Sequence, residues 1–299
     1  MSKISVVLPT YNGSEYLAES IESVINQTFT DWELIIINDC STDNTLEIAN
    51  SFAEIDKRIK VFTNPENLKL PKSLNEGFKR ASGEYYTWTS DDNMYEKTAF
   101  EEMVGYFQLH TDCDFVFAKL NYIDENGAVC GSADYINGIL DELPLSNCIG
   151  ACFMYKSFIH KKLNGYNAKK FLVEDYDFWL RVYKKYKMGF IPKELYYYRN
   201  HGESLTATRG EAIKLNRIGL YQDELKWKTL SLDIKIRLCK EIADYYYKHD
   251  NFADFRKYMY ILKKYSQSSF EEYIKYFDRQ KLKYFYKLLM EIKTRIKWK

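Results

Sequence analysis

The strongest constraint on the fold is a regular alternation of short apolar runs and helical segments near the N-terminus. Strands are predicted at residues 4–8, 32–38, 60–63 and 85–89, and helices between them at 14–26, 45–53 and 72–80. Strands that alternate with helices in this way predict a parallel α/β sheet. We expect the first strand to end at Pro9, since proline cannot donate to a central ladder, and Ser14 to cap the following helix.

Polar side chains follow three of these strands. They are Thr10, Tyr11 and Asn12 after the first, Asp39 after the second, and the Asp91-Asp92 pair after the fourth. Ligands of open α/β sheets bind at the carboxyl ends of the strands. Paired carboxylates there suit Mg²⁺ or Mn²⁺ that also holds phosphate oxygens, although a solvated turn would be equally rich in Asp. The first turn, residues 9–14, has one glycine and no G-x-G-x-x-G, which weakens the dinucleotide-binding alternative.

The rest of the chain divides into an irregular part and a helical part. Helices are predicted at residues 100–110 and 173–186, strands at 115–118, within 147–158, at 189–192 and at 195–199, and helices only from about residue 211. Glu174 and Asp175 lie in the first turn of the 173–186 helix, where the helix dipole favours carboxylates. We therefore expect an α/β fold with an all-helical C-terminal module, and domains at 1–208 and 209–299.

The combination of motifs resembles glycosyltransferase family 2, whose members have the GT-A fold, a mainly parallel central sheet flanked by helices. The matching segments are SVVLPTYN at 5–12, IIINDCSTD at 35–43, ASGEYY at 81–86, SDD at 90–92, EDYDFWLR at 174–181 and YRNH at 198–201. Each motif is weak alone, but together they cover about residues 3–208 in the order and spacing of the family. Cys40 departs from the pattern, where glycine is usual, and Ser90 replaces the first Asp of the D-x-D triplet.

The resemblance implies a role for each matching side chain. Pro9, Thr10, Tyr11, Asn12 and Asp39 would bind the donor base, most simply uracil, with Asp91 near the ribose. Asp92 would ligate Mn²⁺ or Mg²⁺ and His201 would be a second metal ligand, although a lone loop histidine is often merely exposed. Asp175 would be the general base, partly desolvated so that its pKa suits proton transfer, with Glu174 as its rival. Arg181 and Arg199 would either hold diphosphate or form ordinary ion pairs.

The resemblance further implies an inverting, metal-dependent hexosyl- or N-acetylhexosaminyltransferase. It would use a UDP-sugar and act on a lipid-linked or protein-linked glycan of a bacterial surface polymer. Three alternatives stay open: a nucleotidyltransferase, a non-catalytic carbohydrate-binding protein, and nucleic-acid binding through a basic tail. A nucleotidyltransferase would normally have a glycine-rich basic loop, and a carbohydrate-binding protein would not need both Asp92 and Asp175. We expect no nucleic-acid partner.

Charge is distributed unevenly along the chain. Residues 211–299 hold 21 Lys and Arg against 12 Asp and Glu, whereas the rest of the chain is acidic. Basic and apolar residues interleave in 276–299, which is typical of a helix on an anionic membrane and also of a solvated helix or an oligomer contact. The six cysteines form no C-x-x-C pair, and no signal peptide or membrane-spanning run is found. We expect a cytoplasmic protein, attached at the inner face of the membrane if the tail binds lipid.

Overall fold

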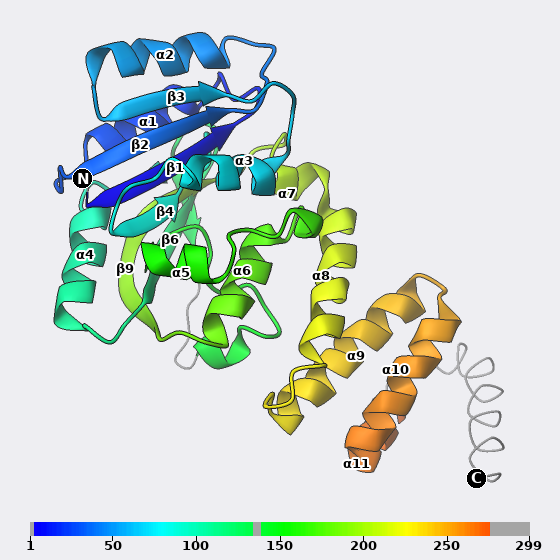
Figure 1. Ribbon diagram of the computed structural model, residues 1–299. Coiled ribbons are helices and arrows are strands. Elements are labelled where there is room, and N and C mark those ends of the chain that lie inside the picture. The colour runs from blue at the N-terminus through cyan, green and yellow to red at the C-terminus, as the bar shows by residue number, and fades with distance from the viewer. Residues whose placement is uncertain (1–2, 134–138, 276–299) are drawn as a thin grey trace. The chain divides into compact units, whose positions relative to one another are not determined.

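The computed structural model describes residues 3–133 and 139–275, and its chain forms two compact units that meet in sequence between Ile213 and Lys214. Figure 1 shows the first unit as a twisted sheet flanked by helices and the second as helices only. The predicted α/β class and the helical C-terminal region are confirmed within the described residues. The predicted tail at 276–299 lies outside them.

The N-terminal half of the sheet is parallel. Its strands run in the order β3 (Ile59–Thr63), β2 (Trp32–Asn38), β1 (Ile4–Thr10) and β4 (Tyr85–Trp88). Every residue of β1 and of β2 is buried, which explains why these strands read as continuous apolar runs. Parallel pairing places the carboxyl ends of all four strands at one edge, where the polar residues of the sequence motifs follow.

Helices cover both faces of this half-sheet. α1 (Leu17–Ile25) and α2 (Thr45–Ile55) join the core cluster on the face that carries Val6 and Ile36. α3 (Leu70–Phe78) packs on the opposite face so closely that a Cβ on Gly77 would lie 2.3 Å from the side chain of Val7. Successive side chains of a strand point to opposite faces of the sheet, so Val6 and Val7 contact different helices.

Two expectations about the first strand and the first helix are wrong. β1 continues through Pro9 to Thr10, and Pro9 pairs in register with Ile37 of β2. Pro9 lies two residues after Val7, whose backbone carbonyl faces β4, so the backbone nitrogen of Pro9 also faces the β4 side. β4 last pairs with Val7, so Pro9 has no ladder partner there to donate to. Ser14 is not the N-cap of α1, which begins at Leu17 after Tyr16 and has no side-chain cap.

The second half of the sheet is mixed. β8 (Phe153–Lys156) joins β4 in antiparallel fashion, and next come β6 (Phe115–Ile123), β9 (Met188–Arg199) and β5 (Met94–Tyr95), with β7 (Val129–Ser132) paired to β6. The strands expected at 189–192 and 195–199 are one strand, β9. Its register against β6 shifts after Ile191, so Pro192 lies at a bulge, where a missing backbone donor is tolerated.

The helices after β4 complete the two units. They are α4 (Ala99–Leu109), α5 (Ser157–Lys162), α6 (Glu174–Tyr183), α7 (Leu205–Thr208), α8 (Gly210–Glu224), α9 (Leu232–Lys248), α10 (Phe252–Tyr265) and α11 (Gln267–Lys275), with 3₁₀ turns at Ile139–Glu142 and Ala168–Lys170. In the C-terminal unit α9 and α10 bury Leu238, Ile242 and Met259 between them. No helix in the described part of the chain is long and apolar enough to cross a membrane.

Candidate active site

The turn after β1 is joined to the residue pair after β4. Thr10 Oγ1 donates a 2.5 Å hydrogen bond to Asp91 Oδ2, and a Cβ added to Gly13 would lie 2.0 Å from the same oxygen. Burial, together with the charge of Asp92, raises the pKa of Asp91 to about 7, although the bond from Thr10 acts in the other direction. Asp91 therefore lies in a tight, partly desolvated position at the end of the sheet.

The turns after β1 and β2 also hold each other. Asn12 adopts a left-handed backbone with φ of 54°, and its Oδ1 accepts from the Thr42 amide at 2.8 Å. The Asn12 amide donates in return to Ser41 Oγ at 3.0 Å. Tyr11, by contrast, is 50% exposed, so its ring is free to stack on a planar ligand.

Asp39, at the end of β2, is almost fully buried and binds its own neighbourhood. Its carboxylate accepts from Asn64 Nδ2 at 2.7 Å and from the amides of Leu68 and Lys69, both at 2.9 Å. Only the Lys69 amide bonds to Oδ2 in the described residues, so this oxygen retains capacity for one more donor. Cys40, which follows it, has φ of 65°, the conformation for which glycine is the usual residue.

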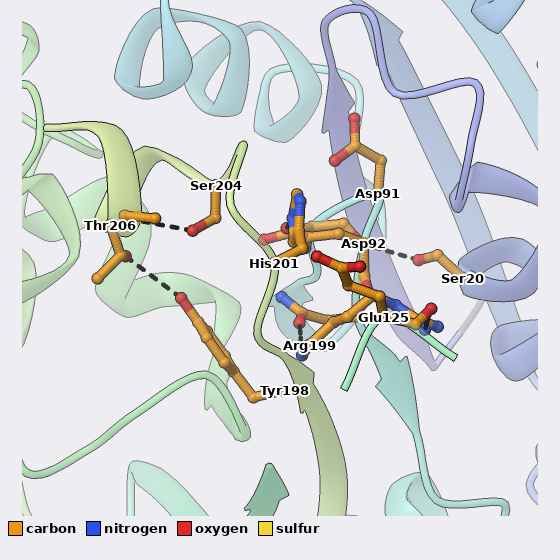
Figure 2. A network of polar contacts seen from close by, with 12 residues as sticks. Ser20, Asp91, Asp92, Glu125, Tyr198, Arg199, His201, Ser204 and Thr206 are labelled. Carbon is orange, nitrogen blue, oxygen red and sulfur yellow. Dashed lines mark hydrogen bonds and ion pairs between the residues drawn. The ribbon is translucent and has the colours of Figure 1, made fainter. Parts of the chain in front are cut away.

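Asp92 and His201 form the centre of the site (Figure 2). His201 Nε2 lies 3.1 Å from Asp92 Oδ2, and Tyr16 contacts the imidazole edge-on at 5.3 Å between ring centroids. Asp92 Oδ1 is buried and has no hydrogen-bond partner in the described residues. A buried carboxylate oxygen without a donor costs free energy, so it suits an additional cationic group.

Arg199 attaches the end of β9 to the loop that carries Asp92. Its Nε donates to the Asp92 carbonyl at 3.0 Å, its Nη1 to the Glu125 carbonyl at 2.9 Å, and its Nη2 pairs with Glu19 at 2.5 Å. Its amide is bonded to Asn93 Oδ1 at 2.8 Å. The side chain is 1% exposed, so Arg199 acts as a tether that sets Asp92 against His201. The alternative in which Arg199 holds diphosphate has no geometric support.

Glu174 and Asp175 begin α6 in different environments. Glu174 is 4% exposed, and its Oε2 has no partner in the described residues. Asp175 is half-buried, and it accepts from the Tyr176 amide at 2.6 Å and from Asn147 Nδ2 at 2.9 Å. Burial raises the pKa of both carboxyl groups, and the charge of Asp175 adds to the rise at Glu174. Asp175 is thus the member of the pair that solvent and a substrate can reach.

The phenol of Tyr198 is affected by the charges of both Asp92 and Asp175. Burial raises the pKa of its phenol, its 3.3 Å hydrogen bond to Thr206 lowers it, and the charges of Asp92 and Asp175 both raise it further. Both carboxylates therefore act electrostatically on the phenol of Tyr198.

The donor set at Asp92 fits a metal ion that is completed by a substrate. Across residues 3–133 and 139–275, no group of three or more His, Cys, Asp or Glu side chains is arranged to hold a metal. Mg²⁺ in phosphate-transfer sites is commonly held by one or two carboxylates, with waters and substrate phosphates as the other ligands. Asp92 with its unpartnered oxygen, and His201 beside it, meet that requirement.

The structure brings two pairs of the residues that the motifs indicated into contact. Thr10 with Asp91, and Asp92 with His201, are in direct contact, whereas Asp39 binds its own loop and Arg181 binds Asp177 and backbone carbonyls. Sequence reasoning missed Asn147 and the tethering role of Arg199. The YRNH motif could have indicated the latter, but nothing in the sequence marks an exposed loop asparagine.

Comparison with known proteins shows which sequences the chain resembles. The profile of the family "Glycosyl transferase family 2" matches residues 5–188. An uncharacterised glycosyltransferase of Haemophilus influenzae is 29% identical, over 97% of each chain. TuaG of Bacillus subtilis, which is assigned to teichuronic acid biosynthesis as a glycosyltransferase, is 32% identical over 42% of this chain and 49% of its own.

Two solved structures have a similar fold. Staphylococcus aureus TarS 1–349 in complex with UDP-GlcNAc has a TM-score of 0.63 at 20% identity, covering 91% of this chain and 79% of that one. The mannosyltransferase PcManGT of Pyrobaculum calidifontis, in complex with GDP-Man and Mn²⁺, has a TM-score of 0.60 at 14% identity, covering 96% and 79%. At these identities the likeness concerns the fold.

Proposed function

Because the chain belongs to glycosyltransferase family 2, we propose that it transfers a hexose or N-acetylhexosamine from a UDP-sugar to an acceptor hydroxyl, with inversion at the anomeric carbon. The observation that carries this proposal is the carboxylate of Asp92, whose buried Oδ1 has no hydrogen-bond partner in the described residues and whose Oδ2 lies 3.1 Å from His201 Nε2. Membership of this family makes the chain a glycosyltransferase.

The donor nucleotide binds at the carboxyl ends of β1, β2 and β4 in this proposal. Tyr11 offers an exposed ring to the base, and Asp39 Oδ2 keeps a lone pair for the N3–H of uracil. Asp91 and Thr10 border the ribose, with Pro9 and Asn12 shaping the turn. UDP is favoured because TarS, a structural neighbour, binds UDP-GlcNAc, whereas GDP-Man in PcManGT is the competing possibility.

Asp92 and His201 would hold a divalent cation, Mn²⁺ or Mg²⁺, which when bound neutralises the diphosphate that leaves. Arg199, which donates to the Asp92 carbonyl and pairs with Glu19, would hold the loop that carries Asp92. Mn²⁺ in the complex of PcManGT supports the choice of metal.

Asp175 would take the proton of the acceptor hydroxyl while the acceptor oxygen bonds to the anomeric carbon. The bond from that carbon to the diphosphate oxygen breaks in the same step, and UDP leaves with the electron pair. The raised pKa of Asp175 makes it a better base than an ordinary surface aspartate. Glu174 is less suited, because it is almost fully buried.

The acceptor would be a growing glycan of a bacterial surface polymer, lipid-linked or protein-linked. This part of the proposal is supported by the similarity to TuaG, which is assigned to teichuronic acid biosynthesis.

The first experiment is a hydrolysis screen of UDP-, GDP- and CDP-sugars, each with Mn²⁺, with Mg²⁺ and with EDTA. We expect a UDP-sugar to be turned over with metal only, and Asp92→Asn to lower the rate by about 100-fold or more because the cation loses its carboxylate. Isothermal titration calorimetry of Mn²⁺ into the protein with UDP measures the loss of metal affinity in the same variant. Asp112→Asn is the matched control, because Asp112 is exposed before the start of β6 and pairs with Lys187.

Two results would overturn the proposal. Turnover of no nucleotide sugar by the folded wild-type chain would remove the donor assignment. Unchanged metal dependence and rate in Asp92→Asn would remove the metal site.

A further inference from the structure

The hydrogen bond between Asn147 and Asp175 has a defined polarity. An ionised carboxylate only accepts, so the group of Asn147 that lies 2.9 Å from Asp175 Oδ2 must be the amide NH₂. The side-chain carbonyl oxygen of Asn147 consequently points elsewhere. Within residues 3–133 and 139–275 it has no hydrogen-bond partner, and the residue is exposed.

The backbone that carries Asn147 is fixed on both sides. Leu143 and Ile149 are completely buried, and Tyr176 Oη donates to the Leu143 carbonyl at 2.7 Å. Tyr176 belongs to α6, the helix that presents Asp175. Asn147 is therefore an exposed polar side chain on an anchored segment, held in a constant position relative to the base.

Asp175 is bonded at both oxygens but is not saturated. Oδ1 accepts from the Tyr176 amide and Oδ2 from Asn147, which fixes the plane of the carboxylate. Each carboxylate oxygen has two lone pairs, so Oδ2 can still accept from an incoming hydroxyl. A hydroxyl bonded there would lie next to the Asn147 amide, whose free carbonyl oxygen is an acceptor.

We propose that Asn147 is an acceptor-binding residue, whose amide group holds Asp175 while its carbonyl oxygen accepts a hydrogen bond from a second acceptor hydroxyl. The favoured acceptor is then a sugar with a vicinal diol: one hydroxyl gives its proton to Asp175 and becomes linked, and its neighbour binds Asn147. The inference rests on the proposed function and adds the class of acceptor to it.

The test is a double-mutant cycle between the protein and the acceptor. Transfer from the UDP-sugar found by the hydrolysis screen is measured to p-nitrophenyl glucoside, galactoside and mannoside, and to the monodeoxy derivatives of the one that accepts best. For the wild-type chain, loss of the hydroxyl adjacent to the linkage site should lower kcat/KM by about 10-fold, as expected for one hydrogen bond. For Asn147→Leu, the intact and deoxy acceptors should react equally well.

Ser146→Leu is the matched control, because Ser146 is the exposed residue directly before Asn147. Like Asn147→Leu, this variant gains a leucine side chain, but it should keep the wild-type preference for the intact acceptor. A second readout is the pH profile of transfer. The bond from Asn147 lowers the pKa of Asp175, so its removal should shift the acidic limb of the profile to higher pH.

The outcomes separate the inference from the proposed function. A wild-type chain that turns over no nucleotide sugar contradicts the proposed function itself. If the wild type transfers sugar but Asn147→Leu loses the same factor with intact and deoxy acceptors, the inference is wrong. Hydrolysis of the donor without transfer to any of these diol-bearing glycosides also overturns it.

Discussion

Glu174 and Asp175 are adjacent in the sequence, yet their side chains have different hydrogen-bond partners and different exposure. Glu174 is buried, with one oxygen unpartnered in the described residues, and burial holds its pKa above the ordinary value. The carboxyl group is therefore held towards its neutral form, which glutamine imitates in shape and in hydrogen bonding. Asp175, bonded by Asn147 and by a backbone amide, is held in a reachable position.

From this difference we expect unequal effects of two amide substitutions. Glu174→Gln should keep transfer within about 10-fold of the wild type, whereas Asp175→Asn should lose about 10³-fold, the usual contribution of a general base. Single-turnover transfer at saturating donor measures the chemical step. Equal and large losses in both variants, with both folded by circular dichroism, would show that Glu174 takes the proton or shares it.

Candidate residues could be named from the sequence where a motif marked them. Asp92, Asp175 and His201 each lie in a segment with a recognisable pattern, and the structure brings Asp92 and His201 into contact. Asn147 could not be predicted, because its meaning depends on a single contact across 28 positions with an exposed side chain. The hydrogen bonds of Asp39 to the 64–69 loop were equally invisible, since they depend on the path of that loop.

At the scale of elements, a buried carboxylate joins the amino ends of the parallel strands, at the edge of the sheet opposite the candidate site. Glu33, on β2, accepts from Ser5 Oγ at 2.7 Å, from Lys60 Nζ at 2.9 Å, and from the amide and hydroxyl of Ser82. Burial tends to raise the pKa of Glu33, but these donors outweigh it and lower the pKa to about 2. Glu33 thus joins β1, β2 and β3 to the segment before β4.

The lowered pKa gives Glu33 a pH-dependent effect on stability. Because the folded pKa lies below the unfolded one, the stabilisation is complete above about pH 4.5 and is lost as the pH falls towards 2. We expect Glu33→Gln to lower the free energy of unfolding by about 2 to 3 kcal/mol at pH 7, and by clearly less at pH 3. Urea denaturation at the two pH values measures the difference.

Glu47→Gln, on the exposed side of α2, serves as the comparison for Glu33, and should change stability little at either pH. If Glu33→Gln is equally destabilised at pH 7 and at pH 3, packing and not charge accounts for the loss of stability.

The alternating pattern predicted the elements of the parallel half-sheet because a helix separates each strand there from the next one along the chain. The mixed half was harder, because β8, β6 and β9 pair across long stretches of chain and the apolar pattern does not encode which strand is the partner. Bulges add a further difficulty. Pro192 suggested a break between two strands, whereas the register shift there leaves β9 continuous.

On the scale of the whole molecule, the chain separates its chemistry from its positive charge. The residues of the candidate site all precede the boundary between Ile213 and Lys214. Beyond it, residues 214–275 hold 13 Lys and Arg against 9 Asp and Glu, whereas residues 276–299 hold 8 against 2. Most of the basic excess therefore belongs to the last segment, where Phe, Leu, Ile and Trp lie between the charges.

This distribution predicts salt-dependent attachment of the full chain to anionic membranes through residues 276–299. A basic side chain near an anionic surface contributes about 1 kcal/mol, so replacing Lys281, Lys283 and Lys287 with Gln should weaken binding by about 100-fold while the apolar residues remain. Co-sedimentation with phosphatidylglycerol vesicles at low salt measures this, with phosphatidylcholine vesicles as the uncharged comparison. Lys226→Gln with Lys228→Gln, in the other part of the C-terminal unit, should bind almost as the wild type does. Equal binding to both kinds of vesicle, unaffected by salt, would exclude an electrostatic attachment and leave the basic segment for another role, such as contact with a second copy of the chain.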